Sequence, residues 1–187
     1  MITITKRKVR ILDFDIENRP LSYWYSDRPT AEVTAIAWSF NDTDDVHTYI
    51  LGRDDTRNGF ERFIEAYDEA TAVTGHYIRK HDLRILNGAM LEEGLRPLSS
   101  KLTIDTKLDL VTQGDLPATQ EHLAEMYGVG APKIHMTQMM WREANRLTRE
   151  GLKKTYDRVV GDVVQHKELR TVLANKGLLG TPRVWSP

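Results

Sequence analysis

Hydrophobic residues follow two different periods along this chain of 187 residues. In the first third, short apolar runs rich in β-branched residues predict buried strands at residues 9–16, 32–40 and 46–51. The polar NDTDD stretch between the second and third runs is typical of a turn, so we expect these strands to form an antiparallel meander. The segment 18–30 contains two prolines and three consecutive aromatic residues, and it indicates an exposed loop.

From residue 58 onward the apolar positions recur at helical spacing, interrupted by two short apolar stretches. The expected helices span residues 58–70, 82–93, 107–112, 119–127, 137–146 and 151–175, and two further strands are expected at 72–75 and 102–104. Strands reached through helical crossovers run parallel, whereas the first three meander. The sequence therefore predicts an α/β fold with a mixed five-stranded sheet flanked by helices. We expect a single domain over residues 1–187, because no linker or repeat divides the chain.

The composition excludes several classes of protein. Hydrophobic residues make up 40% and charged residues 28% of the chain, which supports a packed core. The formal charge of −1 argues against a protein that coats nucleic acid by net charge alone, although a local basic patch stays open. The absence of cysteine excludes disulfides, iron–sulfur clusters and cysteine zinc sites. No apolar stretch approaches the roughly 18 residues of a membrane span, so we expect a cytoplasmic protein without a membrane partner.

Two acidic residues, Asp15 and Glu17, close the first predicted strand. Residues two apart in a strand point to the same face, so both carboxylates are expected to project together. Adjacent carboxylates repel each other unless a cation neutralises them, and Mg²⁺ or Mn²⁺ prefers such oxygen ligands. The alternative is that Glu17 is a solvated residue at the strand end and that Asp15 caps the next turn.

Two further acids lie where they could join that pair. Asp82 follows the predicted strand 72–75 and begins a predicted helix, so its ordinary interpretation is a helix N-cap. Asp162 lies within the last predicted helix among several valines, which places it near the margin of the core. Its ordinary interpretation is a surface residue of an amphipathic helix.

The segments ILDFDIEN, GHYIRKHDLRIL and GDVVQHKEL, with the short IDT at residues 104–106, occur in this order along the chain. Together they resemble the motifs of the DnaQ-like 3′→5′ exonucleases, the DEDD group of the ribonuclease H-like superfamily. The resemblance covers residues 9–173 and implies a ribonuclease H-like fold. The insert KIHMTQMMWREANR and the ending GLLGTPRVW are most similar to small stand-alone members from bacteriophages, which would act in the host cytoplasm.

This resemblance implies a metal-dependent mechanism. The four family carboxylates fall on Asp15, Glu17, Asp82 and Asp162. Asp15 would bridge two divalent cations, Mg²⁺ or Mn²⁺, while Glu17 and Asp162 would help hold the cation that activates water and Asp82 would serve the other. Two such cations, about 3.5–4 Å apart, stabilise both the attacking and the leaving oxygen of a phosphodiester. The implied reaction releases 5′-mononucleotides from a 3′ end.

The chain departs from the family pattern at the general base. The family usually carries a tyrosine four residues, or a histidine five residues, before the final aspartate, and these positions are Arg158 and Asp157 here. Arg158 lies one helical turn before Asp162, and its high pKa prevents it from acting as an ordinary base. We expect Arg158 to hold the scissile phosphate.

Other sources of the base stay open. A bulge in the helix could bring Tyr156 or Asp157 into place. Alternatively, the metal-bound water needs no dedicated side chain. His166, one turn after Asp162, and His135 in the insert are outside candidates.

Aromatic and basic residues are candidates for nucleic-acid contacts. Tyr23 and Trp24 follow the acidic strand and are expected to stack on a terminal base, unless they only anchor the loop. His76 replaces an asparagine common in the family and is expected to hydrogen-bond the substrate strand. The final third contains a basic sector that either contacts nucleic acid or forms a solvated helix face, consisting of Arg142, Arg146, Arg149, Lys153, Lys154 and Arg158.

These observations leave three functional hypotheses. The first is a 3′→5′ exonuclease acting on single-stranded DNA 3′ ends, with replication proteins as possible partners. The second is a 3′→5′ exoribonuclease of the same fold. The third is a non-catalytic nucleic-acid-binding module that has lost its base. Retention of all four acids argues against the third hypothesis, because carboxylates that repel each other without metal are readily lost from a degenerate site.

Overall fold

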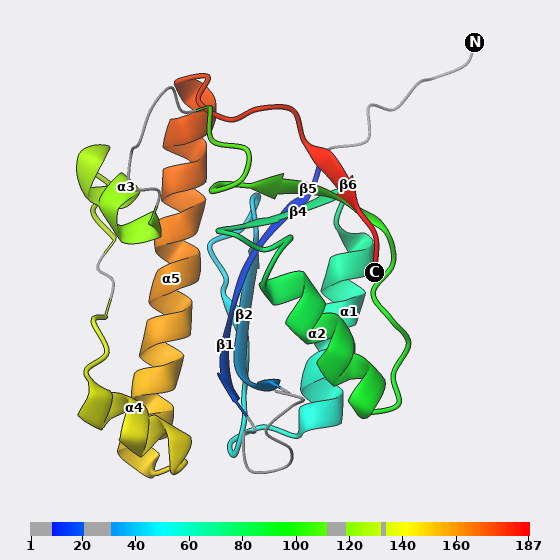
Figure 1. The fold of residues 1–187 in the computed structure, drawn as a ribbon, viewed down its shortest axis with the longest axis vertical. Coiled ribbons are helices and arrows are strands. Elements are labelled where there is room, and N and C mark those ends of the chain that lie inside the picture. The colour runs from blue at the N-terminus through cyan, green and yellow to red at the C-terminus, as the bar shows by residue number, and fades with distance from the viewer. Residues whose placement is uncertain (1–8, 21–30, 112–118, 132–133) are drawn as a thin grey trace.

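The computed structural model describes residues 9–20, 31–111, 119–131 and 134–187. Its strands are β1 (Ile11–Pro20), β2 (Ala31–Phe40), β3 (His47–Ile50), β4 (Ala72–Gly75), β5 (Lys101–Asp105) and β6 (Arg183–Trp185). Its helices are α1 (Thr56–Glu69), α2 (Asp82–Glu92), α3 (Gln120–Met126), α4 (Gln138–Asn145) and α5 (Arg149–Asn175). In Figure 1, α1 and α2 lie on one side of the sheet and α5 on the other.

The six strands form one mixed sheet in the order β3-β2-β1-β4-β5-β6. The first three strands pair antiparallel, as the short polar join between β2 and β3 predicts. β4 pairs parallel with β1, and β5 pairs parallel with β4. Each parallel partner is reached through a helix, α1 or α2. The structure thus confirms the predicted α/β class with a mixed sheet.

The predicted number of five strands is wrong, because a sixth strand, β6, pairs antiparallel with β5. β6 contains only three residues, and one of them, Val184, is 69% exposed. Such a segment is too short to show the alternation of apolar and polar residues that marks a strand in a sequence. Its Trp185 is buried in the main core, which fixes the end of the chain to the sheet.

The helix predicted at residues 107–112 is also wrong over the part that the structure describes. Residues 106–109 instead form a turn at the end of β5. The Asp105 carboxylate accepts hydrogen bonds from the backbone N–H groups of Lys107 and Leu108 at 3.1 and 2.9 Å. Beyond this turn the chain pairs with another segment instead of continuing as a helix, because Leu110 forms a β-bridge with Leu179 and the backbone N–H of Val111 donates to the carbonyl oxygen of Leu178 at 2.8 Å.

The predicted loop at residues 18–30 is wrong at residues 18–20, and residues 21–30 lie outside the described residues. Residues 18–20 continue β1 beyond a register shift between Glu17 and Asn18. A β-bulge of this kind bends a strand and changes the direction of its side chains. The strand is therefore longer than its apolar run, and the acidic residues lie within it rather than at its end.

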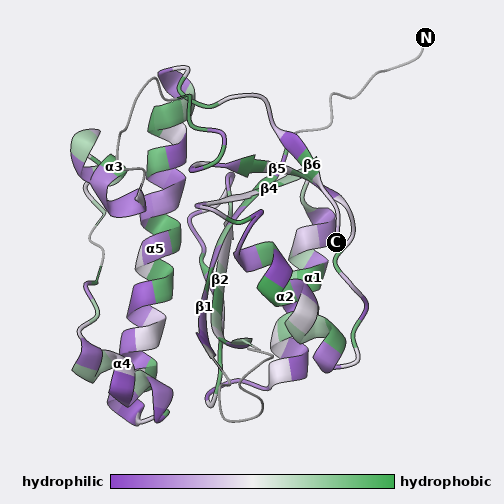
Figure 2. Ribbon diagram, in the orientation of Figure 1, coloured by the Kyte–Doolittle hydropathy of each residue, from purple (hydrophilic) through white to green (hydrophobic). Residues whose placement is uncertain are grey.

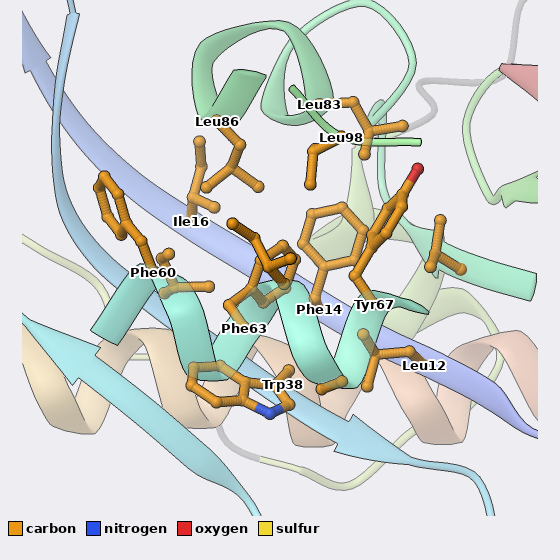
Figure 3. Packing of buried hydrophobic residues seen from close by; sticks show 14 of the residues in the cluster. Leu12, Phe14, Ile16, Trp38, Phe60, Phe63, Tyr67, Leu83, Leu86 and Leu98 are labelled. Atoms are coloured by element: carbon orange, nitrogen blue, oxygen red, sulfur yellow. The ribbon is translucent and has the colours of Figure 1, made fainter. Parts of the chain in front are cut away.

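The main core lies between the sheet and the helices α1 and α2 (Figure 3). Leu12, Phe14 and Ile16 alternate along β1 and point into this core, as period two requires. Phe63 of α1 makes edge-to-face contacts with Phe14 and Trp38, with ring centroids 5.4 and 5.6 Å apart. Such aromatic pairs add specific geometry to the burial of apolar area. Because this packing buries the side chains on one face of β1, only the opposite face of the strand is available for a functional site.

The opposite face of the sheet is covered by α5, the longest of the described helices. Two small residues of β2, Ala35 and Ala37, pack against Val159 and Val163 of this helix. Small side chains on the sheet allow the helix to approach closely. Along α5, Figure 2 shows hydrophobic and hydrophilic residues interspersed, without one uniformly apolar face.

Every fourth residue on one side of α5 is polar and faces β1. Three of these residues, Asp162, His166 and Arg170, are buried, and Arg158 lies one turn before them. Residues four apart on a helix lie above one another. This stripe of α5 and the polar face of β1 together position the candidate site.

The described helices include none that is both long and apolar enough to cross a membrane.

Candidate metal centre

The polar face of β1 presents three carboxylates toward α5. Asp13, Asp15 and Glu17 alternate with the core residues Leu12, Phe14 and Ile16, so all three point away from the main core. The sequence pattern predicted a pair of acids, Asp15 and Glu17, without Asp13. The signal for Asp13 was present, because this residue shares their parity in the strand.

Asp15, Glu17 and Asp162 meet between β1 and α5. Each offers a carboxylate oxygen, and these oxygens all lie within 4.8 Å of one another. Oxygen donors at this spacing suit a hard divalent cation such as Mg²⁺ or Mn²⁺. Carboxylates held this close repel each other unless positive charge is present. The chemistry of the donor set therefore fits a metal centre, and Asp162 lies there as the sequence predicts.

Arg158 provides positive charge at this cluster. Its Nε donates a hydrogen bond to Oε1 of Glu17 at 2.8 Å and lies 3.3 Å from Oδ2 of Asp162. Burial alone would lower the pKa of Arg158, but the negative charges of Asp162, Glu17 and Asp15 outweigh burial and raise this pKa. Arg158 is therefore a permanent cation within the acidic cluster.

A cavity of about 300 Å³ opens over the cluster. Its lining includes all six of the described residues predicted for the site: Asp15, Glu17, His76, Asp82, Arg158 and Asp162. Segments that are up to 147 residues apart in sequence are thus brought to one concave surface. Tyr23 and Trp24, predicted to stack on a base, lie outside the described residues.

Asp82 lies in the same cavity but not among the three converging oxygens. It begins α2 and is only 4% exposed, and Oδ2 of Asp82 lies 3.2 Å from Nδ1 of His81. The hydrogen bond and charge of Asp82 raise the pKa of His81, although burial opposes this rise. The N-cap position of α2 belongs to His81, so Asp82 is not the N-cap that its position first suggested.

His76 is held at the cavity by a buried polar network. Its Nδ1 lies 3.1 Å from the Thr106 hydroxyl, which lies 3.2 Å from Nε2 of His166. Nδ1 of His166 lies 3.1 Å from Oδ1 of Asp13, and Arg170 donates two hydrogen bonds to the Asp13 carboxylate. The network links the α5 stripe, β1 and the end of β5 to His76.

The carboxylate of Asp13 is ionised within this network. Burial raises the pKa of Asp13, but hydrogen bonds and charge from His166 and Arg170 outweigh burial and hold this pKa below its usual value. The sequence motifs did not predict this cluster, because Asp13 lies more than 150 residues from both His166 and Arg170. The i, i+4 spacing of His166 and Arg170 was the available signal.

The alternative general bases do not line the cavity. Tyr156 is partly exposed, and its ring lies 5.3 Å from the Arg53 guanidinium. Asp157 pairs with Lys153 on the surface of α5. His166 is 1% exposed and is engaged by Asp13 and Thr106. α5 is α-helical throughout, so the bulge considered above is absent from this described helix.

The basic sector of the final third is partly neutralised. Lys153 pairs with Asp157 and Lys154 pairs with Glu143. Only Arg158 of this sector lines the cavity over the acidic cluster.

Comparison with known proteins supports the fold. No family model and no curated protein matches the sequence. The structure is similar to that of the family B DNA polymerase from the hyperthermophilic archaeon Pyrobaculum calidifontis, with a TM-score of 0.63 and 17% sequence identity. The match covers 90% of this chain and 25% of the polymerase chain. With its mixed sheet flanked by helices, the chain has the ribonuclease H-like fold that its motifs predict.

Proposed function

We propose that this protein is a metal-dependent 3′→5′ exonuclease of the DnaQ-like family that hydrolyses terminal phosphodiester bonds of DNA. The observation that carries the proposal is the convergence of Asp15, Glu17 and Asp162 within 4.8 Å on a ribonuclease H-like sheet. Asp82 and His76 complete the lining of the same cavity.

Each residue of the site has a distinct role in this proposal. Asp15, Glu17 and Asp162 would hold a divalent cation, and Asp82, at the start of α2, would serve a second one. When bound, such cations lower the pKa of water and offset the charge that develops on the phosphodiester oxygens. Arg158 donates to a phosphate oxygen, and His76, oriented through Thr106, hydrogen-bonds the substrate strand.

DNA is the preferred substrate in this proposal. The insert and the ending of the chain are most similar to bacteriophage members of the family, and the similar solved structure is a DNA polymerase. In that role the products are 5′-mononucleotides, and proteins of DNA replication are the partners that the activity implies. An exoribonuclease would use the same acids and differs by its contacts to the 2′-hydroxyl.

One observation favours a second candidate, a non-catalytic nucleic-acid-binding module. Arg158 already pairs with Glu17 and Asp162, so the cluster has a counter-charge without metal. The cavity and the retained Asp82 favour the enzyme over this module.

The test is a nuclease assay on the purified protein. Single-stranded DNA and RNA labelled at the 5′ or 3′ end would be incubated with Mg²⁺, Mn²⁺ or EDTA. We expect the metals to support stepwise shortening from the 3′ end of DNA, and Asp15→Asn to reduce it at least about 100-fold, since even outer-shell changes at metal sites cost 10–100-fold. Glu65→Gln, an exposed change on α1, is the matched control. Equal activity of Asp15→Asn and wild type would refute the proposal.

A further inference from the structure

The guanidinium of Arg158 forms ion pairs with two of the three clustered carboxylates. Its Nε is 2.8 Å from Oε1 of Glu17 and 3.3 Å from Oδ2 of Asp162. Both residues belong to the group whose oxygens lie within 4.8 Å of one another. One fixed cation is therefore already placed between two of the oxygen donors of the candidate metal centre.

Arg158 is fixed in this position by two contacts outside the acids. One terminal nitrogen donates a hydrogen bond to the backbone oxygen of Ile134 at 2.7 Å. The guanidinium carbon also lies 5.9 Å from the centre of the Trp141 ring on α4. The side chain is 18% exposed, so solvent does not compete strongly for its donors. These contacts orient the Arg158 guanidinium toward Glu17 and Asp162 from the side of α4.

A fixed positive charge at this place opposes a metal ion in two ways. It occupies carboxylate lone pairs that would otherwise coordinate the ion. It also repels a doubly charged ion that approaches within a few ångströms. Both effects are greatest at Glu17 and Asp162, the two acids in short ion pairs with Arg158.

We propose that Arg158 takes the place of one divalent ion by pairing with Glu17 and Asp162. In the absence of nucleic acid the cavity therefore binds one divalent ion rather than two. This inference rests on the proposed function, since it takes the carboxylate cluster to be a metal centre. It assigns Arg158 a role toward the metal in addition to its contact with phosphate. The second ion is admitted only when another group, such as a substrate phosphate, engages the guanidinium.

The experiment counts Mn²⁺ ions bound to the full chain without nucleic acid, from the electron paramagnetic resonance signal of free Mn²⁺. We expect one ion per wild-type chain over a concentration range in which Arg158→Met binds two. The second dissociation constant of Arg158→Met should be at least about tenfold lower than that of the wild type, since a tenfold change is the smallest expected from losing one charge beside the ion. Methionine keeps an unbranched apolar stem next to Trp141 and removes the charge and the donors.

Two further variants act as controls. Arg158→Lys keeps the positive charge and should still bind one ion, which a merely structural role for Arg158 would not predict. Arg158→Gln is also neutral and should bind two ions. It replaces Arg158→Met in the comparison if circular dichroism shows that Arg158→Met does not fold. Two equally tight ions on the wild-type protein, unchanged binding in both neutral variants, or no binding to any variant would overturn the inference.

The same samples separate this inference from the proposed function. A wild-type protein that shortens DNA, but whose Mn²⁺ binding is unchanged by Arg158→Met, keeps the proposed function and loses the inference. A protein that gains an ion in Arg158→Met but whose wild type releases no nucleotide keeps the inference and loses the proposed function.

Discussion

Asp13 shows how a buried charge can support a neighbouring site without touching it. The residue is fully buried, and its carboxylate accepts two hydrogen bonds from Arg170 and one from His166. A buried charge is tolerated only when it is paired and hydrogen-bonded. The network leads through Thr106 to His76 at the cavity, so it helps to set the orientation of that ring.

Replacing Asp13 by asparagine should destabilise the fold strongly. The change leaves the buried Arg170 without its anionic partner, which typically costs about 3–5 kcal/mol. Urea unfolding at pH 7 measures this loss. Asp157→Asn removes only a surface partner of Lys153 and should have little effect, which makes it the matched control. Similar losses for both variants would contradict the assigned role of Asp13.

The contribution of Asp13 should also depend on pH. Because the pKa of Asp13 is lower in the folded than in the unfolded chain, its stabilisation is fully present above the ordinary aspartate pKa of about 3.9. It is lost as the pH falls from there through the pKa of the folded state. The difference in unfolding free energy between wild type and Asp13→Asn should therefore be constant from about pH 5 to 7 and shrink below about pH 4. A difference that grows toward low pH would show the opposite sign of the shift.

Asp15 should couple metal binding to thermal stability. A ligand present at about 100 times its dissociation constant stabilises the folded state by about 2.7 kcal/mol, or about 5–10 °C in a chain of this size. We expect Mn²⁺ to raise the Tm of the wild type by this amount and to leave the Tm of Asp15→Asn nearly unchanged. Equal Mn²⁺ shifts in both proteins would exclude Asp15 as a ligand.

At the scale of elements, the crossing of α4 and α5 positions Arg158. α4 contributes Trp141 beside the guanidinium, and α5 contributes Arg158 and Asp162. The two helices are in close contact at Gly151, where an added Cβ would lie 2.2 Å from the backbone oxygen of Glu143. Backbone cannot move aside as a flexible side chain can, so only glycine fits there.

Gly151→Ala should therefore destabilise the protein by about 1–3 kcal/mol, as overpacked positions do. Gly88→Ala on α2 is the control, because a Cβ at Gly88 meets no atom within 4 Å. There the higher helix propensity of alanine should raise stability by up to about 1 kcal/mol. Chemical denaturation of both variants measures the contrast. A stabilising Gly151→Ala change would show that the two helices are not in close contact.

Periodicity predicted the elements whose own residues repeat an apolar pattern, and it missed those that depend on contacts with distant parts of the chain. α1 was predictable because one apolar stripe recurs along fourteen residues, and its N-cap Asp55 accepts a hydrogen bond from the backbone of Asn58. β6 was missed because three residues are too short for a period, and its stability comes from pairing with β5. The helix expected at residues 107–112 is wrong because Leu110 and Val111 pair with residues 178–179, a long-range contact that helical spacing does not reveal.

At the scale of the whole molecule, the sheet order brings distant acids together. β1 is central in the sheet, and α5 crosses its polar face, so Asp15 and Glu17 meet Asp162. The order of the motifs along the chain was enough to predict that these acids converge. It could not indicate that Arg158 would pair with Glu17, because that contact joins residues 141 positions apart and depends on the approach of α5.

The overall charge of −1 describes this molecule poorly for the same reason. Four carboxylates, those of Asp15, Glu17, Asp82 and Asp162, line one cavity together with the basic residues Lys107 and Arg158. A phosphodiester can enter such a cavity only if cations offset the local negative charge. The distribution of charge, rather than its total, therefore determines whether nucleic acid can bind.

The proposed exonuclease activity requires that these carboxylates, with bound divalent metal, support hydrolysis of a nucleic acid from its 3′ end. The most direct measurement follows a 5′-labelled single-stranded DNA with Mn²⁺, comparing wild type with Asp162→Asn, an isosteric change that removes one clustered carboxylate charge. We predict a ladder of products shortened one nucleotide at a time, release of nucleoside 5′-monophosphates, and no shortening in EDTA or with Asp162→Asn. Shortening that persists in Asp162→Asn, or no shortening by the wild type in any metal, would contradict this account.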